Sequence, residues 1–321
     1  MCDVGRSNGV GPCPSWFTSG RPGGAISYSE RWYVTLKNLL RQRYSGTFFD
    51  SSLLKVAAPA VNKLDQIEQR RKGIPETPEI PPFSLRARSN GSWQQFGGER
   101  FIEAGDRLID FLSTRSLLAS DAEVVEIGCG VGRYALALKR SGKQYRYTGV
   151  DIDASSINWC KSNLADASHS FHLLDVSNGA YNQAGDLDPT SVSFSTFADG
   201  TASLVFLWSV FTHMELDHIR HYLSVMRPML RDGGTIVFSA FIYDDRESIR
   251  TANPHAYRSG FVANLERPMK QIAFPMTEFE RAISDAGLKM ANPPILRAES
   301  PDQMWPIGAG LGQDVFVLEV A

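Results

Sequence analysis

The fold is decided by residues 124–133, which read Val124-Val125-Glu126-Ile127-Gly128-Cys129-Gly130-Val131-Gly132-Arg133. An apolar run that contains one acid leads through three alternating glycines into Tyr134-Ala135-Leu136-Ala137-Leu138, which has the composition of a helix. The stretch therefore predicts a strand, a glycine turn and a helix N-terminus, an arrangement that brings backbone N–H groups close to a ligand. The dinucleotide pattern Gly-x-Gly-x-x-Gly requires glycine at position 133, where this sequence has Arg133. The third glycine comes one residue early, so the turn differs from a phosphate-binding loop.

The composition is that of an ordinary soluble globular protein. The chain has 321 residues, of which 43% are hydrophobic and 21% are charged. A net charge of −2 gives no general reason to expect nucleic acid as a partner. No apolar run approaches the roughly 18 residues of a membrane span, and the N-terminus lacks a secretory apolar core. The four cysteines have neither metal-ligand nor disulfide spacing. We therefore expect a cytoplasmic protein with no membrane span, no bound metal and no nucleic-acid partner.

Three regions are expected along the chain. Residues 1–29 are rich in Gly, Ser and Pro, which predicts disorder. Apolar residues recur at helical spacing over 32–44 and 53–67, and a connector with Pro75, Pro78, Pro81 and Pro82 follows. Residues 30–98 are therefore interpreted as a helical extension with a proline-rich connector, and residues 99–321 as the main domain.

The main domain alternates strands with helices. Apolar runs predict strands at 123–127, 145–150, 171–174, 204–208, 235–241 and 315–320. Helical spacing predicts helices at 101–118, 131–141, 157–164, 216–230 and 277–287. Thr277-Glu278-Phe279-Glu280 has the pattern of a capping box, Asp232-Gly233-Gly234 is expected to end a helix, and 177–201 is interpreted as a polar insertion. The alternation predicts an α/β fold with a doubly wound, mainly parallel sheet.

Three acids lie at or beside successive strand ends, where ligands bind in such sheets. They are Glu126, Asp151 and Asp175. Asp151 comes 19 residues after Gly132, the interval that places an acid on ribose hydroxyls in nucleoside-binding units. Any one of the three could be a solvated strand-end acid, but together they favour a nucleoside site.

The pattern Glu-x-Gly-x-Gly-x-Gly at 126–132 resembles motif I of the class I S-adenosylmethionine (SAM)-dependent methyltransferases. The resemblance covers 121–242 well and 276–321 more loosely. Trp208-Ser209-Val210-Phe211-Thr212-His213-Met214 is similar to a bacterial subgroup found beside glycan or secondary-metabolite pathways. The resemblance implies a Rossmann-like sheet of seven strands and SAM as the cofactor.

The resemblance also implies a set of cofactor-binding residues. In that picture Glu126 holds the amino group of SAM, Asp151 the ribose, and Asp175 the adenine amine, with the Val176 amide near a ring nitrogen. The full set is Glu126, Gly128, Cys129, Gly130, Gly132, Asp151, Ile152, Asp175, Val176 and Trp208.

His213 is the candidate general base. It follows the fourth strand, where class I enzymes place groups that face the transferred methyl, and a neutral imidazole can accept a proton from a hydroxyl. The alternative is a histidine that only caps or packs a helix start. Tyr243, Asp244 and Asp245, after the fifth strand, are other candidates.

We expect a methyltransferase that acts on a small-molecule or glycan acceptor, most readily on a hydroxyl oxygen. The helices within 30–72 and the insertion 177–201 are expected to form the lid and acceptor pocket. The fourth strand ends in Leu-Trp-Ser-Val and lacks the Asn/Asp-Pro-Pro-aromatic turn of amino-methylating DNA enzymes. An aminopropyltransferase and a non-catalytic SAM-binding regulator are the alternatives. The sequence does not indicate an oligomeric state.

Overall fold

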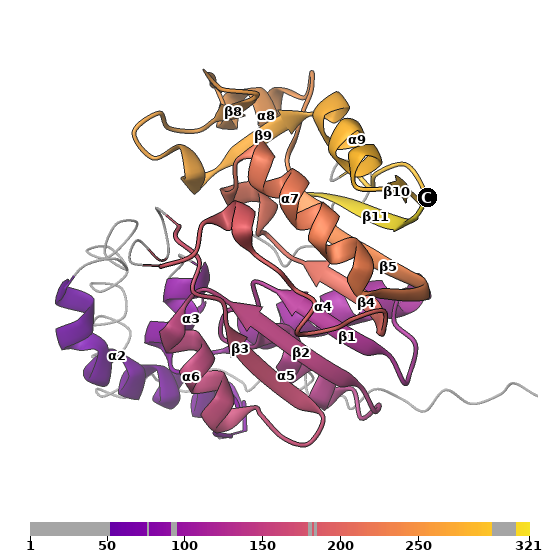
Figure 1. Cartoon of the computed structure of the whole chain (residues 1–321). Coiled ribbons are helices and arrows are strands. Elements are labelled where there is room, and N and C mark those ends of the chain that lie inside the picture. The colour runs from indigo at the N-terminus through magenta and orange to yellow at the C-terminus, as the bar shows by residue number, and fades with distance from the viewer. Residues whose placement is uncertain (1–51, 76, 91–94, 179–181, 183–184, 297–312) are drawn as a thin grey trace, which may run out of the picture. The chain divides into compact units, whose positions relative to one another are not determined.

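The computed structural model of the chain describes residues 52–75, 77–90, 95–178, 182, 185–296 and 313–321 (Figure 1). The segment 1–29 and the helix expected over 32–44 lie outside these residues. All described residues fall within one compact unit, Gly46–Ala321. The division into an extension over 30–98 and a main domain over 99–321 stays a prediction. No helix in the described ranges is long and apolar enough to cross a membrane.

A seven-stranded sheet forms the centre of the fold, and its strand order is β10-β11-β5-β4-β1-β2-β3 (Figure 1). Its strands are β1 (Glu123–Ile127), β2 (Arg146–Asp151), β3 (His169–Leu173), β4 (Ala202–Leu207), β5 (Leu230–Ala240), β10 (Leu288–Met290) and β11 (Asp314–Val320). Strands β1 to β5 pair in parallel, whereas β11 runs antiparallel to both β5 and β10. The predicted Rossmann-like, mainly parallel sheet is confirmed. The strand order reverses between β1 and β4, so a ligand-binding crevice is expected beyond their carboxyl ends.

Helices cover both faces of this sheet. One apolar cluster joins α4 (Glu99–Thr114), α5 (Arg133–Arg140) and α6 (Ala154–Asn163) to Val124 of β1. A second joins α7 (Leu216–Met226) and α9 (Met276–Asp285) to Val125. Because successive strand side chains point to opposite faces, neighbouring residues of β1 enter different clusters. Both faces are therefore buried, which accounts for the continuous apolar runs of β1 and β4.

Two local predictions are wrong. Helix α9 begins at Met276 and its N-cap residue is Pro275, so Thr277 lies inside the helix and no side chain caps it. The second wrong prediction is that Asp232-Gly233-Gly234 ends a helix, because these residues lie inside β5. The helix α7 already ends at Met226 and is followed by the 3₁₀ turn η5 (Arg227–Met229). The pairing of β5 with β4 shifts register nearby, as in a β-bulge, and Gly233 has a φ of 71°.

A second, four-stranded sheet between β5 and α9 is absent from the sequence prediction. Its elements are β6 (Ile242–Tyr243), α8 (Glu247–Ala252), β7 (His255–Tyr257), β8 (Gly260–Val262), η6 (Pro268–Lys270) and β9 (Ile272–Pro275). The strand order is β6-β9-β8-β7, and Figure 1 shows β8, β9 and α8 gathered at the top of the view. Strands of two to four residues are too short to show a reliable alternating pattern.

The N-terminal helices are α2 (Ser52–Arg71), as predicted, and α3 (Phe83–Asn90), which the sequence does not indicate. They are joined by a buried ion pair that we call the Asp65–Arg86 hub. Asp65 is 1% exposed and Arg86 is fully buried. Arg86 Nη2 donates to both Asp65 carboxylate oxygens, at 2.7 and 2.8 Å. Burial lowers the pKa of Arg86, and the Asp65 carboxylate opposes this effect.

The hub also holds the chain segment that enters α4. Asp65 accepts a hydrogen bond from the Gly97 N–H at 2.7 Å, while Arg86 donates to the carbonyl of Gln95. Helix α4 then packs closely on the start of α5: a Cβ on Gly105 would lie 2.9 Å from the Arg133 carbonyl oxygen. The N-terminal helices are thereby connected, through α4, to the residue that follows the glycine turn.

Candidate cofactor and active site

The glycine turn between β1 and α5 has a backbone that favours glycine at each of its three glycine positions. Gly128, Gly130 and Gly132 have φ values of 83°, 51° and 72°, which L side chains rarely adopt. Space is also absent: a Cβ on Gly128 would lie 2.4 Å from Val210 Cγ2, and one on Gly132 would lie 2.3 Å from Leu164 Cδ1. The turn thus lies directly against the loop after β4, where the strand order reverses.

Four N–H groups of this turn are already used inside the protein. Gly128 and Cys129 both donate to the Val150 carbonyl, at 2.7 and 3.1 Å. Gly132 donates to the Cys129 carbonyl at 3.0 Å, and Gly130 donates to Asp151 Oδ2 at 2.6 Å. A phosphate-binding loop instead directs such N–H groups toward its ligand. The geometry therefore favours a ligand without phosphate at this position.

Asp151 ends β2 beside the turn. Its Oδ2 accepts from Gly130 N–H and its Oδ1 accepts from Asp153 N–H at 2.8 Å. Burial raises the pKa of Asp151, and these backbone donors oppose that rise. The Ile152 N–H also acts on this carboxylate. Since a carboxylate has about four lone-pair sites, acceptor capacity remains for a ligand hydroxyl.

Glu126 lies beneath the turn, 1% exposed. The hydroxyl of Tyr147, which is 2% exposed, donates to Glu126 Oε2 at 2.5 Å. Burial raises the pKa of Glu126 to about 8, and nearby Asp151 adds to the rise, whereas the Tyr147 hydrogen bond lowers it. The sequence indicates Glu126 but not Tyr147, because nothing in the pattern of β2 shows that its second residue reaches β1.

The third acid, Asp175, follows β3. Its Oδ1 accepts from Asn182 Nδ2 at 2.9 Å. The Val176 N–H, which the sequence interpretation places near an adenine nitrogen, donates to the Leu174 carbonyl at 2.8 Å. Ile152, after β2, is partly buried against the apolar cluster of α7 and α9. The structure thus brings the ends of β1, β2 and β3 to one edge of the sheet, with the Val176 amide already engaged.

The loop after β4 begins with Trp208, which is half-buried against the cluster of α4, α5 and α6. Ser209 follows with a φ of 64°, uncommon for a residue other than glycine. A closed ring of hydrogen bonds holds it: Ser209 N–H donates to Ser239 Oγ (2.8 Å), Ser239 donates to Gln313 Oε1 (2.6 Å), and Gln313 Nε2 donates to Ser209 Oγ (2.7 Å). This ring joins the carboxyl ends of β4 and β5 to the start of β11.

His213 ends the 3₁₀ turn η4 (Phe211–His213). Its Nδ1 lies 3.1 Å from the carbonyl oxygen of Met269 in η6. Because a carbonyl only accepts, Nδ1 carries the proton, and Nε2 is the unprotonated nitrogen of the neutral ring. Burial lowers the pKa of His213, and the backbone at Met269 and Lys270 opposes this. The small sheet is therefore what orients the candidate base.

The alternative candidates after β5 are held by other residues. Both oxygens of Asp244 accept from Arg246 Nε, at 2.9 and 2.8 Å. Arg246 also donates to both oxygens of buried Asp314, at 2.7 and 2.9 Å. Tyr243 stacks on Phe261, with ring centroids 3.5 Å apart. Asp244 and Arg246 thus serve to fasten this loop to the start of β11, which argues against Asp244 as a base.

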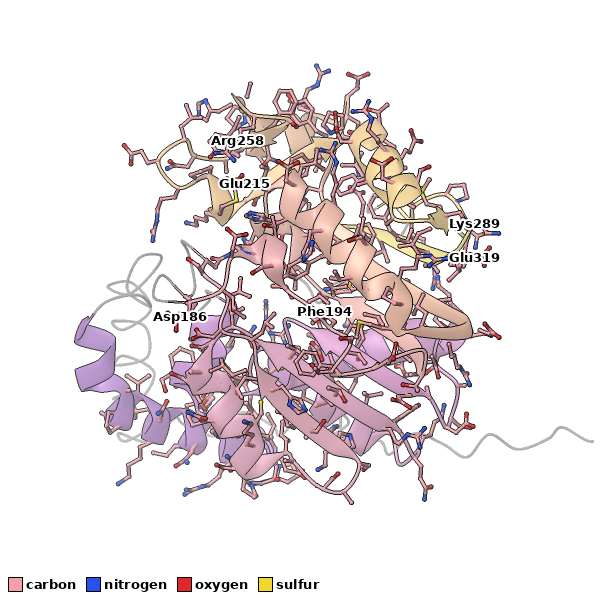
Figure 2. The ribbon with its side chains drawn as sticks, in the orientation of Figure 1. Asp186, Phe194, Glu215, Arg258, Lys289 and Glu319 are labelled. Carbon is pink, nitrogen blue, oxygen red and sulfur yellow. The ribbon has the colours of Figure 1, made fainter. Side chains whose placement is uncertain are left out.

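The insertion 177–201 is only partly polar. Val192, Phe194 and Ala198 are buried in the cluster of α7 and α9. The Phe194 ring meets Tyr222 of α7 edge-on at 5.2 Å, and Figure 2 labels Phe194 within the fold. The second half of the segment thus contributes three side chains to the core, while most of its other residues are exposed.

Comparison with known proteins agrees with this geometry. Residues 97–292, more than half of the chain, match the methyltransferase domain family. A curated relative, the malonyl-[acyl-carrier protein] O-methyltransferase of Acetivibrio thermocellus, is 25% identical over 135 residues, or 39% of this chain and 47% of that protein. The chain thus spans about half the length of that relative.

Solved structures with a similar fold include two SAM-dependent methyltransferases. The protein from Methanosarcina mazei is 18% identical, with 64% of this chain and 95% of that chain covered and a TM-score of 0.45. The protein from Leishmania major is 11% identical, with 79% and 82% covered and a TM-score of 0.46. On the family match over residues 97–292, the chain belongs to the methyltransferase domain family.

Proposed function

We propose that this methyltransferase acts on a hydroxyl oxygen of a small-molecule or glycan acceptor, with His213 as the general base. The observation that carries the proposal is the hydrogen bond from His213 Nδ1 to the Met269 carbonyl. It makes Nε2 the basic nitrogen, and the lowered pKa keeps the ring neutral near pH 7. Family membership favours methyl transfer over aminopropyl transfer and over a non-catalytic regulator.

The residues at the strand ends fit SAM. A buried acid beneath the turn, Glu126, suits the ammonium of the amino-acid tail, and Asp151 suits the ribose hydroxyls. The Asp175 carboxylate suits the adenine amine, although Asn182 already donates to one of its oxygens. When bound, SAM supplies an electrophilic methyl on its sulfonium. The close contact of Gly128 with Val210 leaves no space for a side chain at that position of the turn.

Oxygen is favoured as the acceptor atom for two reasons. A hydroxyl needs a base when it becomes a nucleophile, and a positioned base contributes roughly 10²- to 10⁴-fold. The curated relative is itself an O-methyltransferase. The rest of the rate enhancement comes from alignment of nucleophile and methyl, which is worth ~7–11 kcal/mol in favourable intramolecular cases.

The η6 turn beside the small sheet contacts His213 through the Met269 carbonyl. The segment 177–201 and the N-terminal helices remain the proposed lid and acceptor pocket. Cys129 and Cys160 are free, buried thiols, which supports the expected cytoplasmic, reducing location.

A paired-acceptor assay tests the function. Acceptors that carry a phenol, a sugar hydroxyl or a carboxyl are each compared with their amine analogue, and S-adenosylhomocysteine formation is measured. We expect turnover with the oxygen member of a pair, faster as pH rises through the pKa of His213. Turnover confined to amine members would overturn oxygen as the acceptor atom.

Asp151→Ala is expected to weaken SAM binding by one to two decades. Hydrogen bonds to a charged group are worth ~1.5–3 kcal/mol, and ~1.4 kcal/mol is one decade of affinity. Part of the loss comes from the turn itself, because Gly130 N–H and Asp153 N–H lose their acceptor. Titration calorimetry measures the effect, and unchanged affinity would exclude the ribose role.

A further inference from the structure

Tyr147 reaches Glu126 because residue 149 has no side chain. In the pairing of β1 with β2, Glu126 lies opposite Gly149, and Val124 lies opposite Tyr147. A Cβ on Gly149 would lie 2.9 Å from the Tyr147 hydroxyl oxygen and 3.0 Å from Cys129 Sγ. The hydroxyl therefore lies in the space that this glycine leaves, two residues along the strand, and meets Glu126 Oε2 at 2.5 Å.

The surroundings of Glu126 contain few groups that balance a negative charge. The titratable and charged groups that act on it from β2, α5, α6 and the turn are Tyr147, Asp151, Arg133, Tyr134, Cys129 and Cys160. Arg133 is the cation among them, while Asp151 disfavours the carboxylate. On the neighbouring strand β4, the residue paired with Glu126 is Phe206, which has no charge. Among the residues that the structure describes, Tyr147 is the side chain that hydrogen-bonds the Glu126 carboxyl.

We propose that Tyr147 is a positioning residue of the cofactor site: its hydroxyl orients Glu126 and sets how readily that carboxyl ionises, so that SAM binding releases a proton. The inference rests on the role proposed for Glu126 toward the ammonium of SAM. When SAM binds, the neutral carboxylic acid of Glu126 gives its proton to the buffer, and the carboxylate that remains pairs with the ammonium of SAM.

The electrostatics give the direction of the effect. A pKa of about 8 keeps Glu126 protonated at pH 7 in the cofactor-free protein, and an adjacent ammonium favours the ionised form. The pKa of Tyr147 is itself raised by burial, so its hydroxyl remains a donor. SAM affinity should therefore rise by up to tenfold per pH unit below about pH 8, over the range in which the ammonium of SAM keeps its proton.

The raised pKa of Glu126 also affects the stability of the fold, but with the opposite dependence on pH. The acid has an ordinary pKa of 4.5 and a folded pKa of about 8, so the folded protein binds more protons than the unfolded chain between these values. The stability of the cofactor-free protein should therefore fall as pH rises through this window. A Glu126→Gln variant should lack that component of the fall.

Proton release is measured directly on the wild-type protein. SAM is titrated at pH 7 in phosphate and in Tris, whose ionisation heats differ, and the difference in binding heat gives the number of protons released. We expect close to one proton at pH 7 and clearly fewer at pH 8, where Glu126 is already about half ionised before SAM binds. Normal binding without proton release would overturn the inference and leave the proposed function intact. If the wild-type protein binds no SAM at any pH, the proposed cofactor site itself is wrong.

A matched pair of variants tests Tyr147 itself. Tyr147→Phe removes the hydroxyl, whereas Tyr145→Phe removes a nearby buried hydroxyl that has no hydrogen-bond partner in the described part of the chain. We expect Tyr147→Phe to weaken SAM binding at pH 7 by tenfold or more, and to shift the rise of affinity with pH to higher pH. The control should change neither.

Identical affinity profiles for the two variants would refute the role of Tyr147. If Tyr147→Phe does not fold, the proton count on the wild-type protein decides. Infrared spectra of the cofactor-free protein give a further readout: the band of a protonated carboxylic acid at pH 7 should disappear in Glu126→Gln. Its persistence in that variant would contradict the assignment of the proton to Glu126.

Discussion

His213→Asn is expected to lower kcat by ~10²- to 10⁴-fold while SAM affinity stays unchanged. The asparagine amide retains a donor for the Met269 carbonyl, which His213 Nδ1 now contacts at 3.1 Å, but it cannot accept a proton from a hydroxyl. The loss should shrink for an acceptor whose hydroxyl is already acidic. SAM affinity by calorimetry, melting temperature and kcat across pH together separate catalysis from packing.

The pH profile supplies a second test of the same residue. A base must be neutral, so wild-type kcat should fall as pH decreases through the His213 pKa, which burial lowers from 6.5. That acidic limb should be absent in His213→Asn. His255→Asn is a suitable control, because His255 is an exposed histidine of β7. Near-normal kcat with a reduced melting temperature would show that His213 only packs.

Arg86→Met is expected to destabilise the protein by ~3–5 kcal/mol. The substitution leaves the Asp65 carboxylate buried with only the Gly97 N–H and the Gln69 amide as its remaining donors among the contacts described for it. Denaturant unfolding, with the slope checked for two-state behaviour, measures the loss. The double variant Asp65→Leu/Arg86→Met should lose less than the sum of the two single variants, because it leaves no unpaired buried charge.

An exposed ion pair provides the matched comparison. Lys289 and Glu319, labelled in Figure 2, lie 3.3 Å apart with side chains 56% and 47% exposed. Lys289→Met should change stability by less than ~1 kcal/mol, since solvent screens such pairs. If Arg86→Met and Lys289→Met lower the free energy of unfolding equally, the buried pair contributes no more to stability than the exposed pair, and the prediction is wrong.

The sequence predicts the sheet and the position of the site because both depend on local patterns. The apolar run that ends at Ile127, the glycines that follow, and the acids Asp151 and Asp175 each carry their signal within a few residues. Confirmed features include the parallel pairing of β1 to β5 in a mainly parallel sheet of seven strands. The sequence does not indicate that β11 runs antiparallel. The roles of the ten cofactor residues stay proposals.

What the sequence does not predict depends on contacts between distant residues. The Asp65–Arg86 hub joins positions 21 residues apart, and the Tyr147–Glu126 hydrogen bond also spans 21. The periodicity of a helix or a strand does not bring residues 21 positions apart into contact, so the sequence pattern does not reveal either pair. The His213–Met269 contact spans 56 residues and requires the small sheet, whose strands are too short for periodicity to show.

The internal hydrogen bonds of the glycine turn bear on how the enzyme avoids inhibition by common metabolites. ATP, ADP and NAD share the adenosine of SAM, so recognition of adenine and ribose alone would let them compete. A polyphosphate tail would meet a turn whose N–H groups at Gly128, Cys129, Gly130 and Gly132 are already engaged, with the Asp151 carboxylate beside them. In the proposed binding mode, the ammonium of the SAM tail would instead meet the acids of this site. Under that binding mode, discrimination among adenosine-containing metabolites would be achieved at the tail, and a cell rich in nucleotides would leave the site available to SAM.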